Sequence, residues 1–270
     1  GWGDRNRILQ PQRKQVILLW LGREDVDEGE KEAFIRKLVD FDNGCGNWGY
    51  KKADRGVYEY RAYFLAAAGI NEFKECSLSD AIVKQIVKWG FGYFDIKEQR
   101  WVTFIEQIAE GARTVLPETI RKNAIDNLIR VFETTQDRFT RTIVADSLGK
   151  IAPGNELAIQ ALIRFFETTQ DRFTRSIVVD ILGKIAPGNE LAIRELIRVL
   201  ETTQNISLTR WDITNSLGKI APGNELAIGA LIRVLETTQN ILPPWDITNS
   251  LGKIAPGNEL AIRELIRVLE

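Results

Sequence analysis

Histidine and methionine are absent from this sequence of 270 residues, and cysteine occurs only twice. Without histidine the chain lacks the usual general base, the usual metal ligand and the centre of a His-bearing catalytic triad. Cys45 and Cys76 are too few for a structural zinc site or a disulfide framework, so we expect two free thiols in a reducing cytoplasm. Because the chain starts at Gly1 and has no methionine, we expect a processed chain or an expressed fragment of a longer protein.

Long apolar runs and excess charge are also missing. The N-terminal run over residues 16–21 is far shorter than the roughly 20 residues that span a bilayer. The net charge is −1, from 36 basic and 37 acidic residues, so bulk electrostatics do not favour nucleic acid or an anionic membrane. We therefore predict no membrane association, no nucleic-acid partner and a cytoplasmic location.

An internal repeat dominates the second half of the sequence. The tetrapeptide Glu-Thr-Thr-Gln begins at Glu133, Glu167, Glu201 and Glu236. The string Ala-Pro-Gly-Asn-Glu-Leu-Ala-Ile places its prolines at Pro153, Pro187, Pro222 and Pro256. Both series advance by 34 or 35 residues, a period typical of helical repeat arrays.

One repeat predicts two helices. Apolar residues recur at helical spacing over 139–151, and Pro153 then denies the first helix a continuing donor. Asn155 is suited to cap a second helix over 156–167, whose apolar face is wide enough for burial on both sides. Two such helices cannot bury their faces alone, so we expect the repeats to stack.

The N-terminal part keeps a similar rhythm without repeating its sequence. Glycines expected to end helices occur at Gly22, Gly69 and Gly111, before the regular series Gly149, Gly183, Gly218 and Gly252. Amphipathic segments flank them at 30–41, 58–68 and 80–89. We predict an all-α, right-handed HEAT-like α-solenoid of about seven helical hairpins. Residues 1–100 would form divergent hairpins and residues 101–270 HEAT repeats, regular from 137; the alternative is a separate helical domain packed on a shorter array.

Several motifs resemble a known family. The 34-residue period also fits tetratricopeptide repeats, but these place proline after the second helix, whereas here it lies between the two helices. The string Ser147 to Ile151 resembles HEAT-like units of cyanobacterial proteins. The segments 16–26 (VILLWLGREDV), 61–70 (RAYFLAAAGI), 86–95 (IVKWGFGYFD) and 108–113 (IAEGAR) resemble the region after the ATPase module of cyanobacterial NACHT-type STAND NTPases.

This resemblance implies a function. In such proteins C-terminal HEAT repeats sense a trigger, protein or other macromolecule, and control N-terminal NACHT and effector modules, with a possible role in antiviral defence or signalling. Those modules are absent here, so their ATPase activity does not transfer to this chain. The repeated Leu-Gly-Lys is not a phosphate loop either, because no glycine lies five residues before Gly149 and Ile151 replaces the Ser or Thr. We predict a non-catalytic interaction module without cofactor or metal; the alternatives are a stand-alone HEAT scaffold or adaptor and a phycobilin-lyase-like HEAT protein.

The candidate binding surface lies on the second helix of each repeat. We define the arginine row as Arg130, Arg164, Arg198, Arg233 and Arg267. Each has a glutamate three residues further on, close enough to pair on the same helix, and second helices line the concave face of HEAT solenoids. A neighbouring polar position varies between repeats and adds Gln160, Arg194 and Arg263 to the surface. The row is either a solvated series of ion pairs or a grip for acidic or extended partners. A second row on the first helices, Arg141, Arg175 and Arg210, is expected to bond neighbours such as Asp146 and Asp180.

Overall fold

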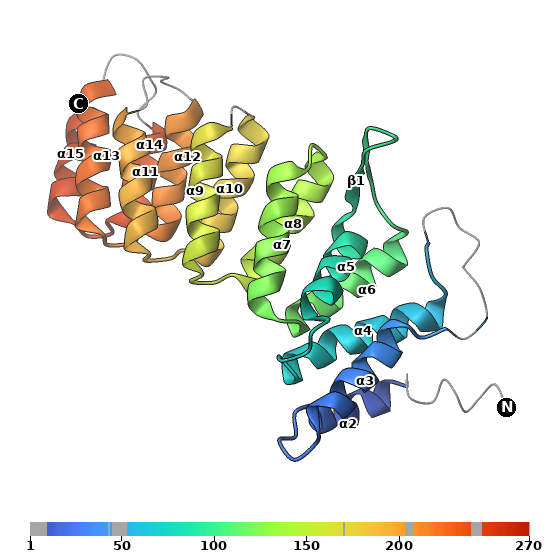
Figure 1. Ribbon diagram of the computed structural model, residues 1–270. Helices are drawn as coiled ribbons and strands as arrows, with labels where there is room; N and C mark the ends of the chain where they lie inside the picture. The colour runs from blue at the N-terminus through green and yellow to red at the C-terminus, as the bar shows by residue number, and fades with distance from the viewer. Residues whose placement is uncertain are drawn as a thin grey trace. The chain divides into compact units, whose positions relative to one another are not determined.

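The computed structural model describes residues 10–42, 44, 53–169, 171–202, 208–238 and 245–269. The chain divides into two compact units, Gly1–Ser147 and Leu148–Glu270, with the boundary inside one helix. Within the described residues there are fourteen α-helices, one short 3-10 helix and one two-stranded hairpin (Figure 1). The prediction of an almost wholly helical fold is therefore confirmed, while the handedness, the number of hairpins and the division at residue 100 stay predictions.

The first unit is a pack of helices of unequal length. Its elements are α2 (Pro11–Leu21), α3 (Glu28–Val39), α4 (Val57–Glu72), α5 (Ser79–Phe91), β1 (Tyr93–Asp95), β2 (Arg100–Val102), α6 (Glu106–Val115), η2 (Leu116–Glu118), α7 (Arg121–Thr134) and the start of α8 (Arg138–Ile151). The helix α4 contacts α2, α3, α5 and α6, and α5 also contacts α7. The core of this unit therefore gathers around α4 and α5, which each carry more buried aromatic and aliphatic side chains than its other described helices.

Six of the seven glycines expected to end helices lie inside them, Gly69 and Gly111 of the first unit among them. Gly22 does follow the last residue of α2, but Gly69 is within α4 and Gly111 within α6. A Cβ atom at Gly69 would come within 2.6 Å of Leu21 Cδ1, and one at Gly111 within 2.6 Å of Phe64 Cε2. The prediction failed because these glycines serve close helix packing, and a helix tolerates glycine where a neighbour fills the missing volume.

A small β-hairpin between α5 and α6 was not predicted. Its strands pair antiparallel, with Tyr93 opposite Val102 and Asp95 opposite Arg100. Gly92 turns the chain from α5 into β1 with φ of +85°, a region that favours glycine. The indole N–H of Trp101 donates to the carbonyl of Phe91 at 2.9 Å, which fastens the returning strand to the end of α5.

The second unit is built from regular helical hairpins in two layers (Figure 1). Its helices are the end of α8, α9 (Glu156–Thr168), α10 (Arg172–Ile185), α11 (Glu190–Thr202), α12 (Leu208–Ile220), α13 (Glu225–Thr238), α14 (Trp245–Ile254) and α15 (Glu259–Leu269). In one layer α10 packs on α12 and α12 on α14; in the other α9 packs on α11, α11 on α13 and α13 on α15. The second helices of the repeats thus form one continuous layer of this unit.

The turn between the two helices of a repeat follows the sequence prediction. The side chain of Asn155 accepts a hydrogen bond from the Ala158 amide at 2.9 Å and so caps α9. The equivalent asparagines Asn189, Asn224 and Asn258 accept from the amide three residues on in the same way. The glycine of each Pro-Gly turn has a φ near +70°, a conformation that asparagine or glycine adopts most readily. These local signals fix where each second helix begins.

Candidate interaction surface

All eight residues predicted for the binding surface are exposed. Arg130 lies on α7 in the first unit, and the other seven lie in the second unit, on α9, α11, α13 and α15. Because these four helices pack side by side in one layer, the arginines of the second unit occupy successive neighbouring helices. The structure therefore forms a row from Arg164, Arg198, Arg233 and Arg267.

The ion pairs of the arginine row run between helices. The guanidinium of Arg233 bonds Glu201 on the preceding helix, with an Nη2–Oε1 distance of 2.6 Å. Arg198 pairs with Glu167 in the same manner, and Arg267 lies 3.6 Å from Glu236. A pair within each helix was expected, and the structure adds a glutamate of the preceding helix as a partner of these three arginines.

Pairs along a helix also occur, in the direction opposite to the predicted one. Arg198 bonds Glu195 at 2.7 Å, and Arg194 bonds Glu190 at 3.0 Å, so the carboxylate precedes the guanidinium. This order is the more favourable one, because the acidic group then lies nearer the positive end of the helix. Guanidinium and carboxylate groups thus alternate along the row. The side chains of Arg198, Arg233 and Arg267 are each more than half exposed.

The arginines of the first helices bond backbone carbonyls and lie over aromatic rings. Arg175 donates from Nε to the carbonyl of Thr169 at 2.9 Å and lies over the Phe166 ring, 5.7 Å from its centroid. Arg141 bonds the carbonyl of Thr135 and lies over Phe132 in the same way. Each arginine therefore fastens the loop that enters its own helix.

Aspartate Asp180, proposed as a neighbour for the first-helix arginines, pairs with Lys219 instead. This lysine lies in the next repeat, so the ion pair joins two hairpins. The side chain of Arg210 lies outside the described residues.

The motifs that resemble NACHT-type proteins meet in the core of the first unit. Leu21 of the first motif packs against Gly69 of the second. Phe64 of the second motif packs against Gly111 of the fourth. Arg113 of the fourth motif donates a hydrogen bond to the carbonyl of Gly90 in the third at 3.0 Å. Their shared property is therefore close packing between four helices.

Trp89, in the third motif, is the centre of an aromatic cluster in the first unit. It is fully buried between Tyr60 and Tyr63, at centroid distances of 4.9 and 4.7 Å. Its indole N–H points at Asp54, which also accepts from the Tyr60 hydroxyl at 2.6 Å. Burial raises the pKa of Tyr63 to about 12, so this phenol stays protonated at physiological pH.

A surface depression of about 560 Å³ also lies in the first unit, lined by α2, α4, α6 and η2. Phe64, Leu65 and Val115 supply apolar lining, and Lys14 bonds Glu118 at 2.6 Å on its polar side. The depression was not predicted, because its lining residues are up to about a hundred positions apart in the sequence and share no pattern.

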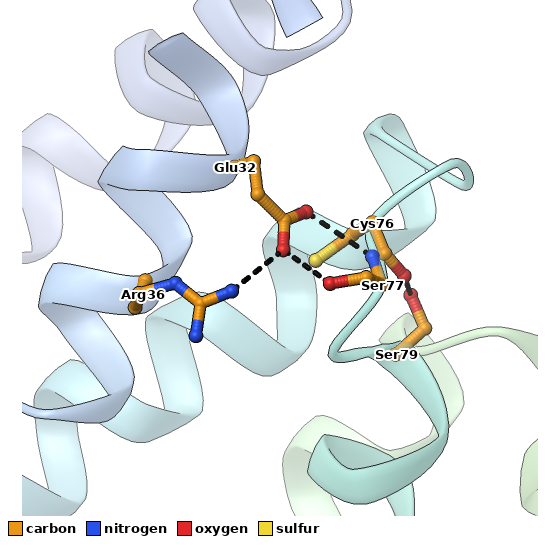
Figure 2. A network of polar contacts seen from close by, with 5 residues as sticks. All are labelled: Glu32, Arg36, Cys76, Ser77 and Ser79. Atoms are coloured by element: carbon orange, nitrogen blue, oxygen red, sulfur yellow. Dashed lines mark hydrogen bonds and ion pairs between the residues drawn. The ribbon is translucent and has the colours of Figure 1, made fainter. Parts of the chain in front are cut away.

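A polar network holds the loop between α4 and α5 against α3 (Figure 2). The Glu32 carboxylate accepts from the Ser77 hydroxyl and, at 3.1 Å, from the Ser77 amide, and Arg36 lies 3.2 Å away. The hydrogen bond from the Ser77 side chain lowers the pKa of Glu32 from its ordinary value. The adjacent Cys76 is a free thiol whose pKa is raised by burial; Cys45 lies outside the described residues.

The described residues hold no cluster of three or more side chains suited to a metal ion. In the same part of the chain, no helix has both the length and the apolar character needed to cross a membrane.

A comparison with known protein families finds no family model that matches this chain, and a comparison with curated proteins finds no sequence that matches it. The resemblance to HEAT and NACHT-type proteins therefore consists only of the motifs described above.

Proposed function

We propose that this chain is a non-catalytic interaction module, the sensing C-terminal arm of a cytoplasmic NACHT-type NTPase. Its partners would be a protein or other macromolecular trigger and the N-terminal NACHT and effector modules of a longer parent. The observation that supports this most is the row of exposed arginines on successive helices of one layer, above a core that repeats almost unchanged. Such a layer lets surface residues vary while the packing stays constant.

The ion pairs of the row bear on how a partner would bind. Exposed pairs of this kind contribute only about 0–1 kcal/mol each, so a ligand can replace a glutamate partner at little cost. An acidic or extended ligand would then offer its own carboxylates or phosphates to guanidinium groups already held in register. We therefore expect a ligand to bind by replacing the glutamate partners of the arginines along the row. Its affinity should fall as the salt concentration rises.

The first test is genetic. The complete reading frame is expected to encode Walker A and Walker B motifs upstream of this region. Removing residues 137–270 from that parent should abolish its triggered ATPase activity while its nucleotide binding is retained. A truncated parent that responds to the trigger with unchanged sensitivity would refute the sensor role and favour a scaffold.

The second test separates charge from stability. Changing Arg233 to glutamate should weaken trigger response, but it also places a like charge beside Glu201. The matched control is the double exchange Arg233→Glu with Glu201→Arg, which restores an ion pair with reversed polarity. We expect this exchange to recover thermal stability and to leave the response impaired. Recovery of both would show that the row acts only through stability.

A further inference from the structure

Exposed leucines form a row across the second helices of the second unit. Leu157 on α9, Leu191 on α11 and Leu226 on α13 are 57%, 38% and 60% exposed. Each is the second residue of its helix, so the three occupy the same position of the repeat. Because α9 packs on α11 and α11 on α13, the leucines belong to one layer. We call these three residues the leucine strip.

A repeated backbone hydrogen bond keeps the repeats in register. The amide of Gly154, in the Pro-Gly turn of one repeat, donates to the carbonyl of Ile185 in the next repeat at 2.7 Å. The amide of Gly188 donates to the carbonyl of Ile220 at the same distance. Since the same contact joins consecutive hairpins, equivalent positions of neighbouring repeats lie side by side. The leucine strip therefore follows from the regular packing of the helices.

Charged rows of opposite sign flank the leucine strip. One residue before each leucine is an exposed glutamate, at Glu156, Glu190 and Glu225. Seven residues after each leucine is a member of the arginine row, on the same side of the helix and roughly 10 Å further along it. The layer thus presents acidic, apolar and basic rows in this order, although glutamates of neighbouring helices also contact the arginines.

Two glutamates of the acidic row are available to a cationic ligand. On α11, Arg194 pairs with the glutamate of the row at 3.0 Å. The equivalent position is Gln160 on α9 and Gly229 on α13, neither of which carries a charge. Within the part of the chain that the structure describes, Glu156 and Glu225 form no ion pair. A lysine or arginine of a ligand can therefore pair with either carboxylate without displacing a cation of this chain.

We propose that the leucine strip binds an amphipathic α-helix of a partner protein, which lies across α9, α11 and α13. The apolar side of this helix covers the leucines, its acidic flank faces the arginine row and its basic flank faces the glutamates. The proposal rests on the proposed function only in that both use the layer of second helices as the binding surface.

The dimensions of the layer favour a helix over a strand as the ligand. Packed helices lie about 8–10 Å apart, close to the rise of about 10.5 Å over seven residues of a helix. Apolar residues spaced by seven therefore meet successive leucines. A β-strand returns to the same side about every 6.6–6.8 Å and falls out of step with them. A helix with its side chains is also about 10–12 Å wide, which lets it reach the charged rows on both sides.

The probe is a synthetic fluorescent peptide of about three heptads. It carries leucines at heptad spacing, glutamates along one flank and lysines along the other. Titrated with the full 270-residue chain, it should bind saturably and gain helicity in circular dichroism. The control peptide has the same composition, with glutamates and lysines mixed on both flanks, and should bind at least ~10-fold more weakly.

Variants of the chain locate the contact. Leu157→Ser combined with Leu226→Ser should weaken binding of the probe at least ~10-fold. The matched control is Val16→Ser combined with Leu19→Ser, a pair on α2 of the first unit that is 65% and 64% exposed. This control should bind the probe as the unchanged chain does.

The charged flank is tested separately. Glu156→Gln combined with Glu225→Gln should narrow the difference in affinity between the two peptides, because the lysine flank then loses its partners. Circular dichroism checks that each variant keeps its helicity. If the leucine variant does not fold, the test uses the unchanged chain and a probe whose leucines are replaced by glutamine, which should not bind.

Three results would each overturn the proposal: binding without a gain of helicity, equal affinity for the two peptides, and no saturable binding of the probe at about 1 mM. Binding that survives the two leucine substitutions but is lost with Arg164→Glu would also overturn it. That last result would leave the arginine row as a binding surface, and the truncation of the parent tests the proposed function independently.

Discussion

At the scale of single residues, two polar side chains of this protein hold loops against helices. Glu32 accepts hydrogen bonds from the Ser77 amide and hydroxyl and so connects α3 to the loop before α5, while Arg175 donates to the Thr169 carbonyl in the loop before α10. Backbone N–H and C=O groups of a loop that are shielded from water need hydrogen-bond partners, and these side chains supply them. These side chains therefore set the positions of the helices that follow.

Replacing Glu32 by glutamine tests this role and its pH dependence. The pKa of Glu32 is lowered in the folded chain, so its carboxylate stabilises the fold above the ordinary glutamate pKa, and this stabilisation is lost as the pH falls through the lowered value. We expect Glu32→Gln to lower the free energy of unfolding by about 1 kcal/mol at pH 7. In urea titrations between pH 7 and pH 3, the difference from the unchanged chain should shrink toward the acidic end. The exposed Glu75→Gln is the control, and a difference that stays constant with pH would contradict the assignment.

At the scale of elements, glycine decides how closely backbones approach. Gly92 joins α5 to β1 at φ of +85°, and a Cβ atom there would come 2.3 Å from the carbonyl oxygen of Val102. Gly252 is the opposite case, a helical glycine with open space around it. Replacing glycine by alanine should therefore have opposite effects on the stability of the chain at the two positions.

We expect Gly92→Ala to destabilise the chain by about 2 kcal/mol, because both the backbone conformation and the space exclude a side chain. Gly252→Ala should stabilise it by about 0.5–1 kcal/mol through helix propensity. Thermal unfolding followed by circular dichroism compares the two variants. Equal shifts of the melting temperature in the same direction would show that the hairpin does not constrain Gly92.

At the scale of the whole molecule, regular packing in the second unit gives successive hairpins similar burial, with α15 as the exception. The core positions of α9 lie beneath α11, whereas Ile262 and Ile266 of α15 are exposed. Local opening requires less free energy where fewer apolar contacts must be broken. The free energy of local opening should therefore be lower for α15 than for α9.

Amide hydrogen exchange can measure this difference directly. In a chain shown to be monomeric by light scattering, amides of residues 261–268 should exchange at least ~10-fold faster than those of residues 158–165. The helix α13, covered by α15, provides an internal reference with slow exchange. Equally slow exchange in α9 and α15 would mean that the exposed isoleucines do not weaken the helix.

Sequence alone determined the parts of this protein that depend on local backbone chemistry. The proline and asparagine of each repeat located the turn and the cap of the second helix, since both act on backbone groups within a few residues. The 34- or 35-residue period likewise predicted stacked hairpins, because a single hairpin cannot bury its own faces.

The tertiary structure alone decided which residues meet across those hairpins. Arg233 has Glu236 three residues further on in its own helix, and the packing of the helices also brings it to Glu201 on the preceding one. Gly69 and Gly111 carried a signal for helix ends, yet Leu21 and Phe64 from distant segments made them packing sites. Contacts of this kind depend on the distance between helices, and no local pattern in the sequence encodes that distance.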